Sequence, residues 1–185
     1  MDALSEIALK FGTDKCPASY GGTGHSYTPY YFSEYNEHRT RVKRVFELGI
    51  NDGASVYTWE EFFPNADIYC ADIHRPGVDL VNRGRIKSHY VDQTNAASLM
   101  ELRDWLPRGI DLMIDDGNHW PEDQVLTANI LADRLSPGGM YVIEDIPFGK
   151  EEYVVDRILW PWKYTIITFD LKRKSDDCLI VLERE

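Results

Sequence analysis

The chain has 185 residues, a length that suits one domain with a full hydrophobic core. Hydrophobic residues make up 43% of it and charged residues 28%, the balance of an ordinary soluble globular protein. A formal net charge of −11 repels phosphate backbones and anionic headgroups, so we expect no nucleic acid and no membrane as a partner, and a small or neutral substrate instead.

The cysteines and the first residues bear on the cellular compartment. Cys16, Cys70 and Cys178 lie far apart without CxxC spacing, so neither a disulfide framework nor a zinc site is expected. Met1 leads directly into a mixed polar and apolar helix pattern rather than a signal peptide, and no apolar run approaches membrane-spanning length. We therefore expect a cytoplasmic protein.

Residues 1–40 differ in composition from the rest of the chain. A short helix is predicted over Leu4–Phe11, and it leads into a segment from Gly12 to Tyr31 that is rich in Gly, Tyr, Ser and Thr. This segment is too long for a simple connector and contains many aromatic residues. We expect residues 1–40 to form a helical and loop cover over a site in the main domain, residues 41–185.

From Arg41 onward, apolar runs of strand length alternate with helical patterns, which is typical of βαβ units and an α/β fold with a parallel sheet. Strands are predicted near Arg44–Leu48, Asp67–Asp72, Ile86–Asp92, Asp111–Asp115 and Met140–Asp145. Helices are predicted near Ser55–Phe63, Asn95–Leu106, Pro121–Leu135 and Glu151–Leu159. Two final β-rich runs, Tyr164–Asp170 and Cys178–Arg184, flank a basic turn at 172–174 and favour an antiparallel hairpin at the sheet edge.

The first strand of the sheet ends in a glycine-containing loop. Gly49 and Gly53 would let the backbone approach a ligand closely, and the helix that follows offers free N–H groups. The spacing is E-x-G-x-x-x-G rather than G-x-G-x-x-G, and Glu47 and Asp52 would repel phosphates. The loop therefore favours a cationic or neutral nucleoside over a nicotinamide dinucleotide; a plain tight turn is the alternative interpretation.

The next two strands also end in acids. Asp72 closes the second strand, where a carboxylate can accept both hydroxyls of a ribose. Asp92 closes the third strand and allows the same interpretation. Each could instead be a helix N-cap, a position that Asp favours.

The loop Asp115-Asp116-Gly117-Asn118-His119 follows a predicted buried strand, at the sheet edge where ligands gather in open α/β folds. Two carboxylates can hold a hard cation, and a neighbouring imidazole can move a proton. Because His119 precedes the helix predicted from Pro121, we expect the helix N-terminus to lower its pKa and keep it neutral. The alternative is that His119 only caps that helix while the acids bind solvent or sodium.

Together these motifs resemble the class I S-adenosylmethionine (SAM)-dependent methyltransferases. More narrowly, the chain resembles the metal-dependent sugar O-methyltransferases of the macrocin and mycinamicin type and their polysaccharide-methylating relatives. The resemblance is carried by Phe11–Lys15, Glu47–Gly53, Val91–Gln93, Ile114–His119 and Pro137–Asp145. It implies a doubly wound, Rossmann-like seven-stranded sheet of order 3-2-1-4-5-7-6 with strand 7 antiparallel, and makes residues 41–185 the methyltransferase domain. The larger macrolide enzymes carry an extra N-terminal domain that is not expected here.

The resemblance also assigns roles to individual positions. The Glu47, Gly49 and Gly53 loop would hold the methionine part of SAM, Asp72 the ribose hydroxyls, and Asp92 with Gln93 would lie beside the adenine. Asp116 and Asp145 match acids that bind Mg²⁺, and His119 matches the general base. Their neighbours Asp115 and Glu144 are further candidates: Asp115 for the cofactor site or the metal, and Glu144 for the metal.

The implied function is Mg²⁺-dependent transfer of a methyl group from SAM to a sugar hydroxyl of a glycoside, an oligosaccharide or a related natural product. A homo-oligomer is compatible with it. Two alternatives stay open: a catechol-type O-methyltransferase acting on a small aromatic diol, and a non-catalytic module that binds SAM or metal.

Overall fold

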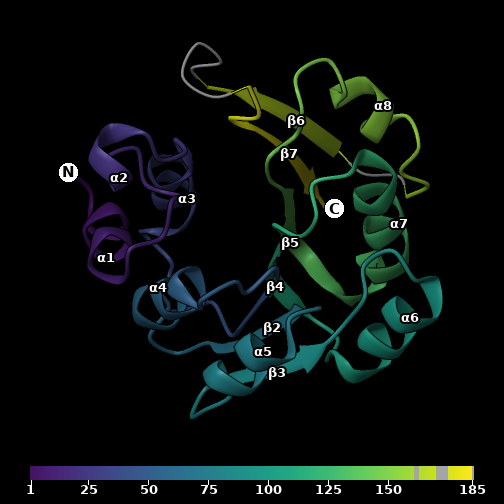
Figure 1. Cartoon of the computed structure of the whole chain (residues 1–185), viewed down its shortest axis with the longest axis horizontal. Coiled ribbons are helices and arrows are strands. Elements are labelled where there is room, and N and C mark those ends of the chain that lie inside the picture. The colour runs from purple at the N-terminus through teal and green to yellow at the C-terminus, as the bar shows by residue number, and fades with distance from the viewer. Residues whose placement is uncertain (161–162, 170–174, 185) are drawn as a thin grey trace.

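The computed structural model describes residues 1–160, 163–169 and 175–184, which fold around one seven-stranded sheet with helices on both faces (Figure 1). The strand order is β3-β2-β1-β4-β5-β7-β6, as predicted. β7 pairs antiparallel with β5 and β6, and the other neighbouring strands are parallel. The strands are β1 (Arg44–Leu48), β2 (Asp67–Asp72), β3 (Ile86–Tyr90), β4 (Ile110–Asp115), β5 (Leu135–Ile143), β6 (Lys163–Thr168) and β7 (Cys178–Glu183).

Three helices begin with recognisable local signals. Asp2 caps the first helix through the backbone N–H of Ser5, and the helix ends at Gly12 with φ +83°. Asn95 caps the sixth helix, and Pro121 opens the seventh. The helices are α1 (Ala3–Phe11), α2 (Ser19–Gly22), α3 (Tyr27–Tyr35), α4 (Ala54–Phe62), α5 (Arg75–Val81), α6 (Ala96–Trp105), α7 (Pro121–Leu131), η1 (Ala132–Arg134) and α8 (Glu151–Val155).

Alternate strand residues feed two cores, one on each face of the sheet. On the first face Val45 packs with Trp59 of α4 and with Tyr31 of α3, so the N-terminal helices share the core of the sheet. On the second face Phe46 packs in a cluster that includes Leu131 of α7. In Figure 1 the N-terminal helices lie beside α4, on the opposite side of the molecule from α6 and α7.

Several elements differ from their predictions. Helix α3 forms where a loop was expected, because Tyr27, Tyr31 and Tyr35 recur at helical spacing and are all buried. Helix α5 was not predicted, since Pro76 and Gly77 hide its pattern. Strand β5 starts at residue 135 rather than 140, and α7 and α8 end four residues earlier than predicted. The β6–β7 hairpin is present, while its predicted basic turn at 172–174 lies outside the described residues.

None of the helices in the described parts of the chain has the length and apolar character needed to cross a membrane.

Candidate active site

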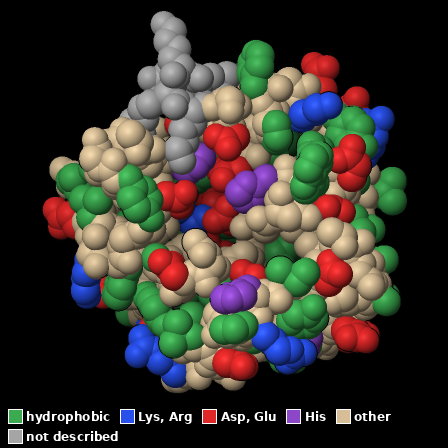
Figure 2. All heavy atoms as spheres, in the orientation of Figure 1, with side chains coloured by type: hydrophobic (Ala, Val, Ile, Leu, Met, Phe, Trp, Pro, Cys, Tyr) green, Lys and Arg blue, Asp and Glu red, His purple; other side chains and the backbone are tan. Residues whose placement is uncertain are grey.

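A cavity of about 610 Å³ lies at the carboxyl ends of the parallel strands. In Figure 2 the surface is hollowed near its centre, and acidic and histidine side chains gather around the hollow. The lining comes from the loops after five strands and from the N-terminal segment. It comprises residues 48–52, Ala54 and Ser55 after β1, 72–74 after β2, 91–94 after β3, 116–119 after β4, Asp145 after β5, and 12–14 with Tyr20.

The loop after β1 packs tightly against the loop after β4. Gly49 has φ +96°, and a Cβ atom there would lie 1.9 Å from the carbonyl oxygen of Asp116. Only glycine fits both the conformation and the space. Gly53, with φ +90°, caps the start of α4 without lining the cavity, and Glu47 is fully buried, where it accepts a hydrogen bond from Ser55. Of the three residues predicted for this loop, Gly49 alone reaches the cavity surface.

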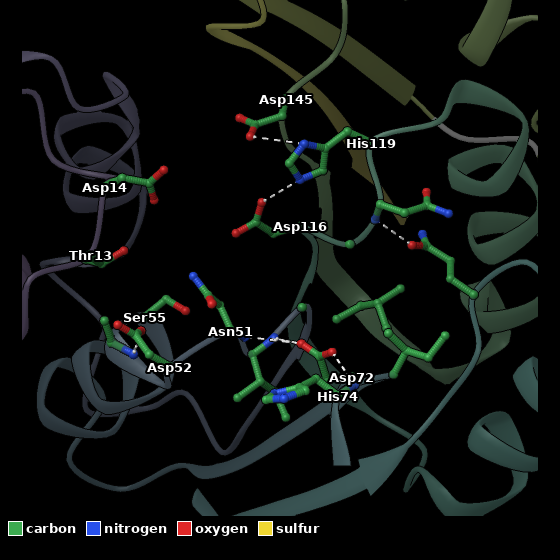
Figure 3. A pocket seen from close by; sticks show the side chains of 18 of the residues that line it. Thr13, Asp14, Asn51, Asp52, Ser55, Asp72, His74, Asp116, His119 and Asp145 are labelled. Carbon is green, nitrogen blue, oxygen red and sulfur yellow. Dashed lines mark hydrogen bonds and ion pairs between the residues drawn. The ribbon is translucent and has the colours of Figure 1, made fainter. Parts of the chain in front are cut away.

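Asp72 holds the glycine-containing loop in place. Its Oδ2 accepts hydrogen bonds from the backbone N–H groups of Ile50 at 2.6 Å and Asn51 at 3.1 Å. Its Oδ1 accepts from the N–H of His74 at 2.8 Å. The carboxylate still lines the cavity, on the side opposite the Asp116 loop (Figure 3). Asp72 is therefore available to a ligand and fixed by its neighbours.

Gln93 joins the loops after β3 and β4. Its Nε2 donates to Asp115 at 2.9 Å, and its Oε1 accepts from the N–H of Asn118 at 2.9 Å. A Cβ atom on Gly117 would lie 2.1 Å from that Oε1, so the glycine is needed for the contact. The neighbouring Asp92 lines the cavity but uses Oδ1 to accept from the backbone and side chain of Thr94. Both residues predicted for the adenine region line the cavity.

Asp115 lies behind the cavity and not in it. It is fully buried, and its carboxylate accepts from Gln93, with the N–H of Gly117 at 3.4 Å and the hydroxyl of Tyr141 at 3.5 Å. Burial raises the pKa of Asp115 to about 7. The structure therefore does not bring this predicted cofactor residue to the cavity surface, because its side chain is buried against Gln93 and Tyr141.

Three predicted residues meet at one side of the cavity. His119 Nε2 lies 3.4 Å from Asp116 Oδ1, and His119 Nδ1 lies 3.6 Å from Asp145 Oδ2 (Figure 3). One ligand atom from each of the three lies within 4.8 Å of the other two. His119 and Asp145 have φ of +59° and +55°, strained values for residues other than glycine. Two carboxylates and an imidazole at this spacing can hold a divalent cation.

The prediction of a lowered pKa for His119 is wrong for this structure. The hydrogen bond with Asp116, together with the charge of Asp145, raises the pKa of His119 to about 9. Two carboxylates at 3.4 and 3.6 Å outweigh the N-terminus of α7, which begins two residues later. Without a cation at the cluster, the imidazole carries a proton at neutral pH.

Lys15, considered in the sequence only as a residue that could order the cover by pairing with Asp14 or with the ligand, pairs instead with acids beside the cavity. Its buried ammonium lies 2.5 Å from Asp116 Oδ2 and 3.5 Å from Glu47 Oε1, and it also pairs with Glu144. Burial opposes the charge of Lys15, but the three carboxylates raise its pKa well above the ordinary value. Burial likewise raises the pKa of Glu47 to about 7, although Lys15 acts in the opposite direction.

Glu144 stands next to the cluster without belonging to it. Its carboxylate is fully buried, pairs with Lys15, and accepts a hydrogen bond from the hydroxyl of Tyr31 at 2.6 Å. The three-residue cluster does not include it. Both of its oxygens are engaged by the N-terminal segment in this structure. Its assignment as a metal ligand stays a prediction.

Asp145 is held by two further residues of the N-terminal segment. The hydroxyl of Tyr27 donates to Asp145 Oδ1 at 2.6 Å. The ring of His25 stacks on Tyr27, and its Nδ1 lies 3.4 Å from Asp145 Oδ1 and 3.5 Å from Asp177 Oδ1. Residues of the N-terminal segment therefore contact the acid cluster directly.

Comparison with known proteins identifies the family. A family model described as a methyltransferase domain matches residues 46–146, and the chain belongs to this family, as the motifs predicted. It is 32% identical over 155 residues to the 8-demethyl-8-alpha-L-rhamnosyl tetracenomycin-C 2'-O-methyltransferase of Streptomyces olivaceus. It is 33% identical over 152 residues to the mycinamicin VI 2''-O-methyltransferase of Micromonospora griseorubida. Each alignment covers 77% of this chain but only 37% and 36% of the relative, so the chain spans little more than a third of their length.

A solved structure has the same fold. The MycE methyltransferase from the mycinamycin biosynthetic pathway, in complex with Mg and S-adenosylhomocysteine (SAH), superposes with a TM-score of 0.69 at 28% identity. The match covers 82% of this chain and 38% of that protein. The predicted fold class and strand order are thus confirmed by the topology and by this neighbour.

Proposed function

We propose that the chain is a Mg²⁺-dependent O-methyltransferase domain that moves a methyl group from SAM to a sugar hydroxyl of a glycoside, an oligosaccharide or a related natural product. The observation that carries the proposal is that the Asp116–His119–Asp145 cluster and Asp72 line one cavity, on opposite sides. A nucleoside held by Asp72 would extend from there toward the cluster. The relatives, which are sugar O-methyltransferases by name, support the same assignment.

The cofactor would lie over the loops after β1, β2 and β3. Asp72 would accept the ribose hydroxyls, since its carboxylate lines the cavity and is already oriented by three backbone N–H groups. Gly49, which lines the cavity, would border the methionine part. Asp92 and Gln93 would border the adenine. This arrangement would direct the sulfonium methyl toward His119.

Asp116 and Asp145 would hold the divalent cation. Oxygen ligands suit Mg²⁺, and Asp116 Oδ1 and Asp145 Oδ2 both face His119. A sugar hydroxyl is by itself a very weak acid. A bound cation would lower the pKa of a hydroxyl that coordinates it. The donor set therefore fits the metal on its chemistry.

His119 would accept the proton of the acceptor hydroxyl. It must be neutral to do so, whereas Asp116 and Asp145 raise its pKa to about 9. Neutralising these two carboxylates removes the cause of the shift, and the imidazole returns toward its ordinary pKa near 6.5. Deprotonation of His119 is then tied to filling of the metal site.

The proposal is tested with labelled SAM and a panel of glycosides, oligosaccharides and small aromatic diols, each with Mg²⁺ or with EDTA. Mg²⁺-dependent label in a glycoside or oligosaccharide supports it. Label in aromatic diols alone would favour a catechol-type enzyme. Calorimetric binding of SAM without product on any acceptor would favour a non-catalytic module, and no SAM binding under any metal condition would reject the assignment.

Partners and location follow from the same proposal. The acceptor would be a small molecule or an oligosaccharide, as in the MycE complex with mycinamycin VI. The domain would act in the cytoplasm, where SAM is made, and light scattering would show whether it forms a homo-oligomer.

A further inference from the structure

The backbone of Lys15 is tied to the start of α3. Its carbonyl accepts hydrogen bonds from the N–H groups of Tyr27 at 3.1 Å and Thr28 at 3.0 Å. The carbonyl of Asp14 accepts from the N–H of His25 at 2.6 Å. A Cβ atom on Gly24 would lie 2.0 Å from the carbonyl oxygen of Cys16, so the backbone at Gly24 packs directly against the backbone at Cys16. The 12–28 segment therefore presents the Lys15 side chain from a fixed point.

The ammonium group of Lys15 serves three acids at once. It pairs with Asp116, Glu144 and Glu47, and its side chain is 3% exposed. Among the described residues, no other lysine or arginine forms an ion pair with any of these carboxylates. Glu47 and Glu144 are fully buried, so solvent does not screen their mutual repulsion. Removing the single cation would leave these buried acids without a counter-ion, so that they would either repel one another or have to take up protons.

The two carboxylate oxygens of Asp116 have different neighbours, Lys15 and His119. Oδ2 lies against the ammonium, while Oδ1 faces His119 on the cavity side. We propose that Lys15 is a positioning residue: an internal counter-ion that keeps the acids of the site assembled, orients Asp116 toward the metal position, and fastens the 12–28 segment over the cavity. The proposal rests on the proposed function in one respect, namely that Asp116 is a metal ligand.

A divalent cation and Lys15 would neutralise the same group of acids. The cation would therefore provide part of the stabilisation that Lys15 provides, and Lys15 part of that of the cation. The charges of the cation and of the Lys15 ammonium would also repel one another. A protein without Lys15 should be unstable when metal is absent, and it should gain more from a divalent cation than the wild type does. A lysine that only fills space in the core would give no such dependence on metal.

The test compares wild type, Lys15→Met, Glu144→Gln and the double variant. In EDTA, Lys15→Met should lower the melting temperature by roughly 10 °C, as expected for breaking a buried ion pair. The double variant should recover at least half of that loss, because one of the unpaired charges is removed. Lys10→Met is the matched control, since Lys10 lies in the same N-terminal region but forms an exposed ion pair, with Glu61 of α4. This variant should change the melting temperature little.

Two further measurements address the competition between Lys15 and the cation and the fastening of the 12–28 segment. Saturating Mg²⁺ or Mn²⁺ should raise the melting temperature of Lys15→Met more than that of wild type, and calorimetry should give a cation dissociation constant about tenfold lower for the variant. Chymotrypsin should cleave after the exposed Tyr20 faster in Lys15→Met than in Lys10→Met, because the 12–28 segment is no longer fastened.

Equal stability of Lys15→Met and wild type in EDTA would overturn the proposal, as would a double variant that recovers nothing. If Lys15→Met does not fold, a folded double variant supports the proposal and an unfolded one overturns it. Equal, measurable cation affinity in wild type and variant would remove the competition between Lys15 and the cation, and equal chymotrypsin cleavage of Lys15→Met and Lys10→Met would remove the positioning role. If no protein binds Mg²⁺ or Mn²⁺ while the stability pattern in EDTA holds, the metal assignment of the proposed function fails and the counter-ion role stands.

Discussion

Asp116 Oδ1 faces His119 Nε2 at 3.4 Å across the loop that follows β4. The two residues are three positions apart, and the +59° φ of His119 turns the imidazole back toward the carboxylate. The same imidazole reaches Asp145 through its other nitrogen. The pKa of His119 is therefore set by the two acids that are proposed to hold the cation. A cation bound there would change the protonation of the proposed base.

Replacing His119 by alanine should abolish turnover and leave SAM binding nearly intact. We expect kcat to fall at least about 100-fold, because the proton acceptor is lost, and the SAM dissociation constant to change by less than about threefold. Steady-state kinetics and calorimetry measure the two effects. His38→Ala is the control, since His38 lies outside the cavity; full activity in His119→Ala would remove the assignment as base.

Asp72→Asn should weaken SAM and SAH alike. The substitution removes the charge that both the ribose hydroxyls and three backbone N–H groups would share, so we expect an affinity loss of about tenfold or more. Calorimetry with SAH measures it without turnover. Asp79→Asn, on the exposed side of α5, should bind as wild type does. Unchanged SAH affinity in Asp72→Asn would contradict the placement of the ribose.

Asp115→Asn should remove a pH dependence of stability. Because the native pKa is raised from 3.8 to about 7, Asp115 contributes stability that is fully present below pH 3.8 and is lost as pH rises through 7. Asparagine can still accept from Gln93 but does not ionise. The variant should therefore become more stable than wild type above pH 7, by an amount on the order of 2–4 kcal/mol.

Urea unfolding at several pH values between 4 and 8 gives this difference. An identical pH profile for both proteins would mean that the pKa of Asp115 is not raised in the native state. The same variant should bind SAH with wild-type affinity, since the side chain lies behind the cavity. A large loss of SAH affinity would instead restore Asp115 as a cofactor residue.

Gly49→Ala should disrupt the contact between the loops after β1 and β4. The new Cβ would lie 1.9 Å from the carbonyl oxygen of Asp116, and φ is +96°. Gly149→Ala is the matched control: it carries a similar φ of +81° but meets nothing within 4 Å. The control should cost about 1 kcal/mol, whereas Gly49→Ala should cost more and lose SAH binding. Equal melting temperatures for the two variants would contradict this account.

The fold and half of the site could be predicted because they depend on local pattern. Strand-length apolar runs that end in Asp72, Asp92 and Asp115-Asp116 place those acids at one sheet edge, whatever the details of packing. Burial then separates residues that are neighbours in sequence. Asp116 faces the cavity, while Asp115 points into the core and is bound by Gln93.

The rest of the site depends on contacts between distant segments. Lys15 is 101 residues from Asp116 and 129 from Glu144, so no local period relates them. Helix α3 was hidden by its aromatic content, which lowers helix propensity, although its buried tyrosines follow a helical period. The pKa of His119 could not be predicted from the helix that follows it, because Asp145 approaches from another strand.

One measurement tests the central claim most directly: a crystal structure grown with SAH and Mn²⁺, with anomalous scattering used to locate the metal. We expect an anomalous peak between the carboxylates of Asp116 and Asp145, with the SAH ribose at Asp72 and its sulfur facing His119. A cavity without SAH, or Mn²⁺ bound to other acids and absent from Asp116 and Asp145, would contradict the proposed methyl transfer at this site.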